Sequence, residues 1–583
     1  MGAVWGTGLW LNKHLERTPA VGATYTEGLI GAPALINPLF ASLNDVDADM
    51  SALIFSGLIK FDQNGQSVVD LAESYTVSED KKVYTFRLRP NIFWHDSATD
   101  APQVLTARDV AFTFERIQNP DTHSPLSITF DGVIVEAVDQ QTVRFTLPQP
   151  FAPFLSTLTV GILPEHIWES IPPEQMRFSQ RNIAQPVGSG PFKADRLERD
   201  ESGHIIRFQV LRFAEFYSPA AYLDSLNFRF FSDYEGEGGA LRALKERRID
   251  GLGFVPTAQK GNIASKYITL HTAEVPEYTA LFFNPDHQVV LKEKSLRTAL
   301  AYALDKTRLV NEAVGGEGQL IESPILPGTP GYHDLPATPY DMTKANALLD
   351  SLWPSVSAEN FRTTRSAAIR KSLDSEKNAS TTPEEITLEV EKQVATEMTD
   401  TQTIYRVNKS GAPLTLNLVT ADTPEYRAIA SVVAAAWRDL GIRTIINFVP
   451  AKDIGRTTIK DRAYDVLLYS VLIGSDPDQY LFWHSSQVDH PGLNLASYKN
   501  EVVDKLLDKI RASHSLEQAN PFYSTLEDTL AADRPAIWLY RPTYTYAVES
   551  SIRGVGVKRV FRPTDRLNDI TAWYQKTQWK WKS

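Results

Sequence analysis

The sequence predicts an α/β protein of two or more domains, and three observations carry this prediction. At 583 residues the chain exceeds what one hydrophobic core usually holds, and 43% of its residues are hydrophobic. A strand, a helix and a second strand follow one another over residues 414–449. An alternating strand and an amphipathic helix also occupy residues 83–120. Strands that alternate with helices in both places indicate the α/β class.

The α/β unit is clearest in the second half of the chain. Residues 414–418 alternate leucine with polar residues, as a strand does, and residues 424–440 carry apolar side chains along one side of a helix. Gly441 stands where helices commonly end, and residues 442–449 form the next apolar strand. This spacing predicts a right-handed parallel crossover, and we expect residues 465–470 to extend the same sheet.

The first half of the chain contains a second clear pattern. Residues 83–88 alternate between two sets of side chains, which predicts a strand. Pro90-Asn91 then turns the chain toward a short second strand at residues 92–94. Thr106 and Asp109 form a capping-box-like pair that opens a helix. The local order is therefore strand, turn, strand, loop and helix.

Composition excludes several classes of function. The formal net charge is −12, and no cluster of Lys and Arg is present that could neutralise phosphates, so we expect no nucleic-acid partner. The chain has no cysteine, which excludes disulfides, thiolate metal sites, cysteine nucleophiles and a lipidated cysteine anchor. Residues 4–11 are apolar but too few to span a bilayer, which takes roughly 18–20 residues. We interpret residues 1–20 as the remnant of an N-terminal anchor or as an engineered terminus.

The stretch from residue 74 to residue 120 also resembles the signature region of the family 5 extracellular solute-binding proteins. These proteins are the dipeptide, oligopeptide and nickel receptors of ABC importers. The resemblance implies an α/β, periplasmic-binding-protein-like two-lobed (cluster C, type II) fold with an extra subdomain in the first lobe. The motifs that carry it, in the order and spacing of the family, are Ser78-Glu79-Asp80, Tyr84-Thr85-Phe86, Leu88-Arg89, Trp94-His95-Asp96 and Leu105-Thr106-Ala107.

The resemblance extends from Tyr25 to about Tyr574 and implies domain limits. Pro186 to Phe192 resembles a family turn, and we expect its glycines, Gly188 and Gly190, to adopt positive φ. The implied domains are residues 21–50, 170–273 and 541–583 for lobe I, residues 51–169 for the extra subdomain of lobe I, and residues 274–540 for lobe II.

Residues 355–404 interrupt the family pattern. They are rich in Glu, Lys, Arg, Ser and Thr, and they separate two segments that the family usually joins closely. Thr382-Pro383-Glu384-Glu385 is a strong helix start, and apolar residues recur at every fourth position from Ile386 to Met398. We therefore expect an inserted helical hairpin on lobe II, either as a lightly packed excursion or as a partner-docking element.

The resemblance implies the extracytoplasmic substrate-binding component of an ABC importer, a protein without catalysis or cofactor that binds peptides in a cleft closing between two lobes. The implied partners are a peptide or other small solute and an ABC permease in the membrane, and we expect a monomer. The implied location is the periplasm or the cell surface, with a tether through an N-terminal anchor largely missing from this chain. Two alternatives stay open: a non-peptide solute such as an oligosaccharide or a metallophore, or a tethered interaction or chaperone-like module that uses the hairpin.

The resemblance also places candidate ligand-binding residues in both lobes. In relatives, the residues before the first turn line the ligand cleft. Tyr278 and Asn284 belong to the strand that resembles the opening of lobe II. The candidates in lobe I are Ile30, Gly31, Ala32 and Pro33.

A loop after the strand at residues 464–470 resembles the ligand-facing loop of lobe II. Its candidates are Gly474, Ser475, Asp476 and Asp478. Val471 and Ile473 stand near the positions where peptide-binding relatives carry a Trp and an Asp, so capture of a peptide amine would fall to Asp476. The alternative is that Asp476 and Asp478 cap the short helix that follows.

Further candidates follow this loop at Trp483, Asn494 and Tyr498. Tyr and Trp offer stacking area at little entropic cost, and ordinary core packing is the alternative for each. His484 and His490 lack a ligand spacing and a third ligand, so we expect no metal site. No Gly-Lys-Ser/Thr follows Pro186 to Phe192, which argues against a phosphate loop, and no nucleophile elbow is present.

Overall fold

The computed structural model divides into two compact units. Unit 1 comprises Met1–Val275 and Tyr544–Ser583, and unit 2 comprises Pro276–Thr543. The residues that the structure describes are 15–98, 102–151, 154–263, 265–329, 331–375, 382–398, 402–451, 453–473, 478–490, 492–513 and 515–581.

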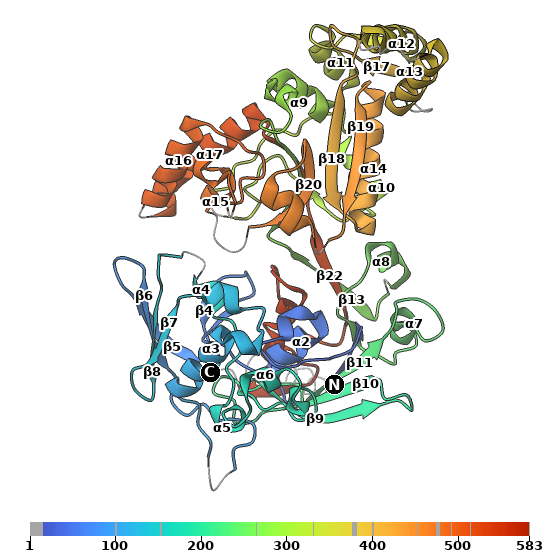
Figure 1. Cartoon of the computed structure of the whole chain (residues 1–583). Coiled ribbons are helices and arrows are strands. Elements are labelled where there is room, and N and C mark those ends of the chain that lie inside the picture. Colours follow the sequence, from blue (N-terminus) through green and yellow to red (C-terminus); the bar gives the residue numbers. More distant parts are fainter. Residues whose placement is uncertain are drawn as a thin grey trace, which may run out of the picture. The chain divides into compact units, whose positions relative to one another are not determined.

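A seven-stranded sheet forms the centre of unit 1 (Figure 1). β2 runs parallel to both of its neighbours, β11 and β12, and the remaining described pairs in the sheet, β9 with β10, β10 with β11 and β12 with β22, are antiparallel. The strand order is β13 (Ile268–Glu274), β22 (Thr543–Glu549), β12 (Gly251–Leu252), β2 (Thr24–Ile30), β11 (Ser225–Phe231), β10 (Ile205–Arg212) and β9 (Phe192–Arg199). Unit 1 also contains the helices α2 (Asp45–Ile54), α4 (Phe154–Thr157), α5 (Glu165–Trp168), α6 (Pro173–Met176), α7 (Ala240–Lys245) and α8 (Thr257–Ile263).

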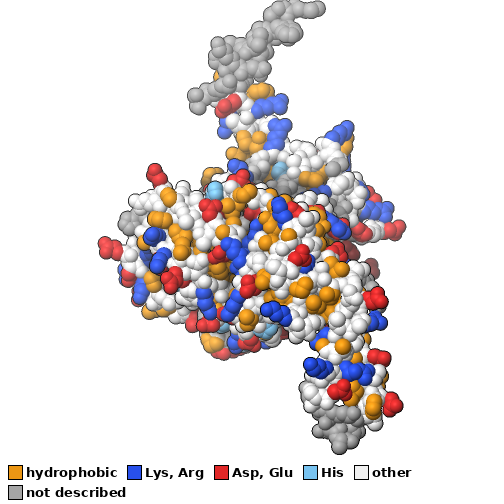
Figure 2. Space-filling model, turned by 90° about the horizontal axis from the view of Figure 1, so that it is seen from above, with side chains coloured by type: hydrophobic (Ala, Val, Ile, Leu, Met, Phe, Trp, Pro, Cys, Tyr) orange, Lys and Arg blue, Asp and Glu red, His pale blue; other side chains and the backbone are white. Residues whose placement is uncertain are grey.

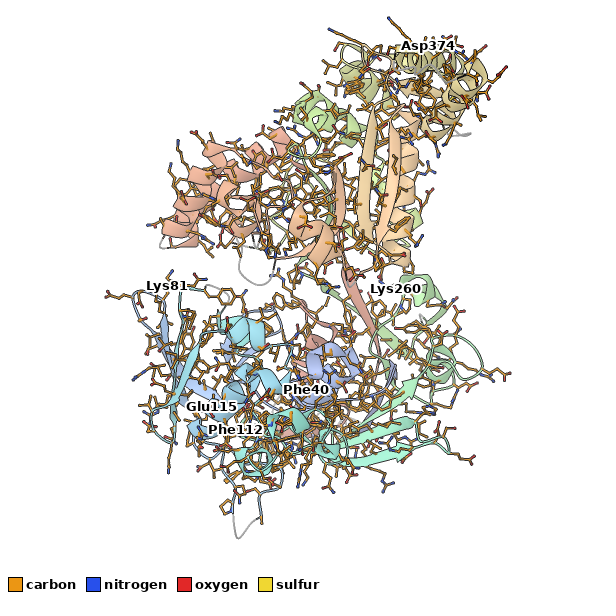
Figure 3. All side chains as sticks on the ribbon, viewed as in Figure 1. Phe40, Lys81, Phe112, Glu115, Lys260 and Asp374 are labelled. Atoms are coloured by element: carbon orange, nitrogen blue, oxygen red, sulfur yellow. The ribbon has the colours of Figure 1, made fainter. Side chains whose placement is uncertain are left out.

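A four-stranded antiparallel sheet and one helix that packs against it form a second part of unit 1. Phe114 of α3 (Ala107–Gln118) packs edge-on against Phe145 in the middle of this sheet. Figure 3 places Lys81 at the turn between β5 and β6, and Phe112 and Glu115 on α3. The strands are β5 (Ala72–Val77), β6 (Val83–Leu88), β8 (Thr142–Thr146) and β7 (Ile134–Ala137), and a separate pair joins β3 (Ile59–Phe61) to β4 (Ser67–Val69).

The structure confirms the predicted strand at residues 83–88 and the helix that Thr106 opens. The Asp109 carboxylate accepts a hydrogen bond from the Thr106 backbone N–H at 2.8 Å, which forms the predicted capping box. The predicted second strand at residues 92–94 is wrong, because only Phe93 forms a single bridge, to Val104. Two backbone hydrogen bonds flank this bridge, from Trp94 N–H to the Gln103 carbonyl at 3.0 Å and from Leu105 N–H to the Ile92 carbonyl at 2.8 Å, but the pairing extends no further.

The expectation of positive φ at Gly188 and Gly190 is also wrong. Neither residue lies in the left-handed region. A Cβ at Gly188 would collide with the carbonyl oxygen of Ile54, and one at Gly190 with that of Leu53, so these glycines permit close approach of two backbones. The same two carbonyls lie at the end of α2, which the turn at residues 186–192 therefore contacts directly.

A six-stranded mixed sheet forms the centre of unit 2. Its order is β15 (Gln319–Leu320), β21 (Ala536–Arg541), β14 (Glu277–Phe283), β20 (Val466–Leu472), β18 (Thr415–Ala421) and β19 (Arg443–Val449). β18 runs parallel to β19 and to β20, and Figure 1 shows α14 (Pro424–Asp439) along these strands. The predicted parallel strand–helix–strand unit is therefore confirmed, and so is its extension by residues 465–470.

Helices cover unit 2 and enclose two apolar cores on the faces of this sheet. One core gathers around Trp437 and Phe283, and the other around Trp483 and Trp538. The helices are α9 (Lys294–Tyr302), α10 (Lys306–Ala313), α11 (Met342–Asp350), α15 (Tyr480–Trp483), α16 (Glu501–Ala512) and α17 (Leu516–Asp533).

Two helices with a small core of their own occupy residues 355–404. They are α12 (Ala358–Ser375), which ends beside Asp374 in Figure 3, and α13 (Pro383–Glu397), and the pair β16 (Ser355–Ser357) and β17 (Ile404–Arg406) closes their base. Glu385 completes a capping box with Thr382 at the start of α13, as the sequence predicts. The apolar contacts between the helices come from Ile369, Ile386, Val390 and Val394. That this hairpin is an insertion relative to the family stays a prediction.

The two ends of the described chain pair with each other. β1 (Leu15–Pro19) lies antiparallel to β23 (Thr577–Trp581) as a two-stranded ribbon. We find no helix among the described residues with the length and apolar character needed to cross a membrane.

Candidate functional site

A cavity of about 380 Å³ opens in unit 1 at the carboxyl ends of the parallel strands β2 and β12. Ligands of α/β sheets commonly bind at this edge, because the loops that leave the strands meet there. The cavity is lined by Gly28, Leu29, Ile30, Asp45, Val46, Asp49, Tyr234, Leu252, Gly253, Phe254, Tyr544, Pro563 and Arg566.

A buried ionic network lies at the cavity floor. The Arg566 guanidinium donates to both carboxylate oxygens of Asp49, at 2.9 and 2.6 Å, and its Nε donates to Glu27 at 3.0 Å. The Tyr25 hydroxyl donates to the second oxygen of Glu27 at 3.0 Å. Burial raises the pKa of Glu27, while the charge of Arg566 opposes this shift. Two carboxylates thus share one guanidinium.

Asp45 adds a third carboxylate at the cavity mouth. It is the first residue of α2 and is exposed, and Asn44 caps the helix by accepting a hydrogen bond from Val46 N–H at 3.0 Å. Within the described part of the chain, the Asp45 carboxylate forms no hydrogen bond or ion pair. Partial burial and the neighbouring Asp49 raise its pKa. A cationic group that entered the cavity would relieve this excess of negative charge.

Aromatic rings form the walls of the cavity. The rings of Phe254 and Tyr544 pack with their centroids 5.6 Å apart, and Phe254 stays 38% exposed. The Tyr544 hydroxyl donates to the carbonyl oxygen of Gly253, which fixes the ring against the end of β12. Tyr234 follows β11 and completes the wall. Aromatic faces beside carboxylates suit an ammonium or guanidinium group.

The predicted lobe I candidates lie at this same edge. Ile30 is the last residue of β2 and lines the cavity, while Gly31 and Ala32 are exposed and Pro33 is buried. Gly31 has a φ of 97° and donates its N–H to the Phe231 carbonyl at 2.9 Å. The chain turns there toward α2, so the structure brings Ile30 to the cavity.

The α2 helix holds the turn that follows these candidates. The buried Asp47 carboxylate accepts hydrogen bonds from the backbone N–H groups of Ala34 and Leu35, at 2.7 and 2.9 Å. Asn44 donates to the carbonyl oxygen of Ala32 at 3.1 Å. The turn and the start of α2 are therefore one hydrogen-bonded unit.

In unit 2, Tyr278 and Trp483 are fully buried. Trp483 packs against Trp538 and Phe282, with ring centroids 5.6 and 6.3 Å apart. Burial raises the pKa of Tyr278, and the nearby indoles of Trp483 and Trp538 lower it by a smaller amount. Both candidates lie inside an apolar core, and their predicted role in ligand binding stays a prediction.

The next three candidates, also in unit 2, are held by internal hydrogen bonds. Asn284 donates to the Arg462 carbonyl at 2.9 Å, and Asn494 donates to the Tyr498 carbonyl at 2.8 Å. The Tyr498 hydroxyl donates to Asp533 at 2.7 Å. In each case the polar group stabilises a turn or a helix end, and a role toward ligand stays a prediction.

Gly474, Ser475 and Asp476 lie outside the described residues. Asp478 accepts a hydrogen bond from the Tyr480 backbone N–H at 3.0 Å, but the N-cap residue of α15 is Gln479 rather than the predicted Asp478. Its other oxygen pairs with Arg511, whose Nε lies 2.8 Å away. Arg511 in turn lies 3.7 Å from the centre of the Tyr480 ring. The carboxylate is thus committed to two internal partners.

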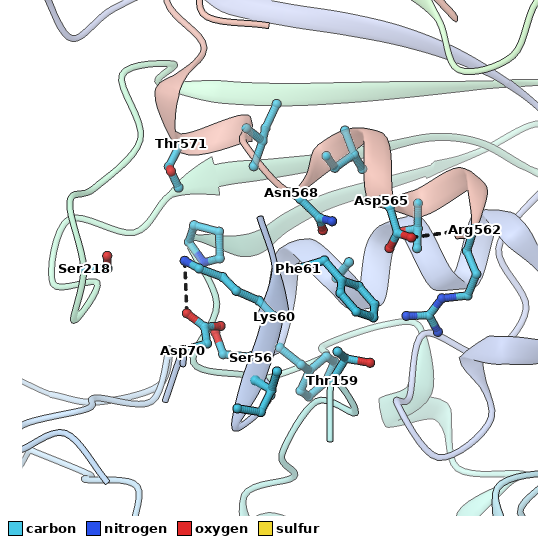
Figure 4. A pocket seen from close by; sticks show the side chains of 18 of the residues that line it. Ser56, Lys60, Phe61, Asp70, Thr159, Ser218, Arg562, Asp565, Asn568 and Thr571 are labelled. Atoms are coloured by element: carbon cyan, nitrogen blue, oxygen red, sulfur yellow. Dashed lines mark hydrogen bonds and ion pairs between the residues drawn. The ribbon is translucent and has the colours of Figure 1, made fainter. Parts of the chain in front are cut away.

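A second, smaller cavity of about 120 Å³ also lies in unit 1 (Figure 4). Lys60 pairs there with Asp70 at 3.3 Å. Asp565 accepts hydrogen bonds from the backbone N–H groups of Phe561 and Arg562, at 2.8 and 3.0 Å. Because Asp70 is paired with Lys60 and Asp565 is satisfied by backbone N–H groups, the larger cavity is the better candidate site.

Sequence reasoning missed Asp45, Tyr234, Phe254 and Tyr544. They come from four separate segments that the sheet order brings together. The Asp250-Gly251 motif could have indicated Phe254, because the residues just beyond a buried strand lie at the carboxyl edge of the sheet. No local pattern indicates the other three.

An α/β chain of two compact units, with a cavity lined by aromatic and carboxylate side chains at the edge of a sheet, has features of a binding protein. The family model of the bacterial extracellular solute-binding proteins, family 5, matches residues 66–491. The chain belongs to this family, whose members are not enzymes but binding proteins of transporters. The predicted family and fold class are therefore confirmed.

Individual relatives resemble the chain over nearly its whole length. The oligopeptide-binding protein AppA of Bacillus subtilis (strain 168) is 23% identical over 571 residues, which cover 96% of this chain and 93% of AppA. The solved structure of AppA in complex with a nonapeptide has a TM-score of 0.62 and covers 96% of this chain and 99% of AppA. The structure of NikZ from Campylobacter jejuni in complex with Ni(L-His), at 23% identity, has a TM-score of 0.61 and covers 94% of this chain and 99% of NikZ.

Proposed function

We propose that this chain is the extracytoplasmic substrate-binding component of an ABC importer and that it binds peptides. In this proposal the ligand occupies a cleft that closes between two lobes, and the closed form delivers it to a membrane permease. We further propose that the protein acts as a monomer. The cavity at the carboxyl edge of β2 and β12 carries the proposal, because it joins an aromatic wall to an excess of carboxylates.

The charge at this cavity supports a ligand with a cationic group. Asp45 faces the opening, while Asp49 and Glu27 already share the single guanidinium of Arg566. A peptide offers such a group at its amino terminus or in a basic side chain, and its backbone and side chains offer contacts to the aromatic wall. The complex of AppA with a nonapeptide supports this proposal, because a protein of similar fold binds a peptide.

Native mass spectrometry of freshly purified protein tests the proposal first. Co-purifying masses that correspond to a mixture of peptides are the expected result. A single non-peptide mass would instead favour the alternative of a non-peptide solute, an oligosaccharide or a metallophore, and the complex of NikZ with Ni(L-His) supports the metallophore. Absence of any ligand, together with no closure in small-angle scattering on addition of a peptide pool, would contradict the proposal that the chain is a peptide receptor.

A paired substitution tests the role of the cavity. Asp45→Asn removes the charge at the cavity mouth, and we expect about a five- to tenfold loss of affinity for peptides, because charge-assisted hydrogen bonds contribute roughly 1.5–3 kcal/mol and this group is partly solvated. Asp195→Asn, an exposed carboxylate on the edge strand β9, is the matched control. Equal affinities of the two variants in titration calorimetry would remove Asp45 from the site.

A further inference from the structure

The ribbon of β1 and β23 has two chemically different faces. Its register places Arg17 opposite Trp579 and Glu16 opposite Lys580. Because side chains alternate along a strand, Trp579 and Trp581 share one face with Arg17, and Gln578 and Lys580 share the other with Thr18 and Glu16. One face is aromatic and cationic, and the other is polar with opposed charges.

The aromatic face is exposed. Trp579 is 52% exposed and Trp581 is 64% exposed, and the Arg17 guanidinium lies 5.0 Å from the centre of the Trp579 ring. No acidic partner of Arg17 is found in the described part of the chain. Trp573, by contrast, is fully buried in unit 1, so the exposed tryptophans of this end of the chain are those of β23.

The base of the ribbon is fixed to unit 1. Ala20 N–H donates to the Lys576 carbonyl at 3.0 Å, and Gly22 N–H donates to the Tyr222 carbonyl at 2.8 Å. Trp573 lies in the core of the unit, edge-on to Tyr25. In Figure 2, hydrophobic and Lys or Arg side chains lie side by side on the narrow projection at the upper edge of the view. The ribbon thus presents its faces from a rigid base.

We propose that the aromatic face of this ribbon binds the surface of an anionic phospholipid bilayer. Indole rings favour the boundary between headgroups and acyl chains, where the apolar ring is buried and the N–H stays wet. Arg17 can bury its aliphatic stem there while its guanidinium meets lipid phosphates. The polar face then remains in water, as expected for an element lying in the interface.

A bilayer explains these features better than a protein partner does. A two-stranded ribbon is marginal by itself and offers little area, less than a stable protein interface needs. Two neighbouring tryptophans with an arginine require no shape-matched pocket in order to partition into lipid. Residues 4–11, which precede β1, are apolar in sequence and include Trp5 and Trp10. Arg17 gives the aromatic face a positive charge, while Glu16 and Lys580 oppose each other on the polar face, and this charge complements an anionic surface.

The absence of cysteine from the chain permits a site-specific test. Thr577→Cys places a single thiol on the aromatic face and Gln578→Cys places one on the polar face, so each can carry the same environment-sensitive fluorophore. With phosphatidylcholine vesicles containing phosphatidylglycerol, we expect a blue shift and quenching by spin-labelled lipid for the label at position 577, and much smaller changes at 578. No change at either position, or equal changes at both, would overturn the proposal.

Vesicle co-sedimentation of the full chain provides an independent measurement. The double variant Trp579→Ala/Trp581→Ala should bind anionic vesicles about tenfold more weakly than the unaltered chain, because two exposed rings no longer enter the interface. Thr18→Ala/Gln578→Ala is the matched control and should bind normally. Unchanged binding of the tryptophan variant would overturn the proposal, as would concentration-dependent self-association that only this variant loses. Peptide affinity should be equal in all variants, so failure here is distinguishable from failure of the proposed function.

Discussion

His95 donates a hydrogen bond from Nε2 to the carbonyl oxygen of Gly190, with the two atoms 3.0 Å apart. Its Nδ1 accepts the backbone N–H of Gly188 at 3.3 Å, which assigns the proton to Nε2. The histidine of the Trp-His-Asp motif and the glycines of the turn at residues 186–192 are therefore one structural unit, although about ninety positions separate them. The glycine turn provides the hydrogen-bond partners of both ring nitrogens of His95.

This arrangement predicts that acid weakens unit 1. Burial lowers the pKa of His95 to about 4, with a further contribution from the charge of Lys193. Because the folded pKa lies below the unfolded value near 6.5, the unfolded chain binds more protons between these values, and stability falls as pH decreases from 6.5 toward 4. We expect a loss of about 2 kcal/mol by pH 5 in urea unfolding. His95→Gln should be less stable at pH 7 but should show a smaller change on acidification, and an identical pH profile would contradict the role of His95.

Gly190→Ala should destabilise unit 1 by about 1–3 kcal/mol, because the new Cβ would collide with the backbone carbonyl of Leu53 and α2 would have to move. Gly261→Ala is the control in the same unit. Gly261 lies in α8 with open space around it, so alanine there should be neutral or slightly stabilising. Urea unfolding followed by a probe in unit 1 compares the two. Equal urea midpoints for the two variants would show that residue 190 has room for a Cβ beside the backbone carbonyl of Leu53.

The elements that could be predicted from the sequence are those whose information is local. The alternating leucines of β18, the Thr423 cap and Gly441 mark the strand, the helix and the helix end without reference to the rest of the chain. Residues 92–94 have the same apolar character but only one bridging partner. A strand at residues 92–94 would need a longer partner strand beside it, and the local sequence does not show whether such a partner is present.

The cavity could not be predicted for a related reason. Asp45, Phe254 and Tyr544 become neighbours only because β2, β12 and β22 lie side by side. Ile30 is a candidate only because the family resemblance places the residues before the first turn in the ligand cleft, and its role toward ligand stays a prediction. The candidates Tyr278 and Asn494 carry residue types typical of ligand sites, yet buried aromatic and amide side chains serve core packing and turn formation equally well.

Arg566 should be essential to the stability of unit 1. Arg566→Met would leave Glu27 and Asp49 buried without a cation, and we expect a loss of about 3–5 kcal/mol at pH 7. The loss should shrink at pH 5, because the unpaired carboxylates can then take up protons. Arg87→Met, which removes an exposed pair with Glu73 at 3.5 Å, should cost less than about 1 kcal/mol. Denaturant unfolding at pH 7 and at pH 5 measures these losses of stability. A loss for Arg566→Met that is the same at both pH values would contradict the role of the unpaired carboxylates.

Glu527 should give unit 2 the opposite pH dependence of stability to the one that His95 gives unit 1. Its side chain is fully buried in α17 and accepts a hydrogen bond from the Ser323 hydroxyl at 2.5 Å. Burial raises its pKa to about 8, so the folded chain holds a proton that the unfolded chain releases near pH 4.5. Stability of unit 2 should therefore fall as pH rises from 4.5 through 8, by about 2 kcal/mol between pH 6 and 8. Glu527→Gln keeps the shape and cannot ionise, so its unfolding midpoint should change little over this range. A midpoint that falls with pH as steeply as that of the unaltered chain would assign the effect to another group.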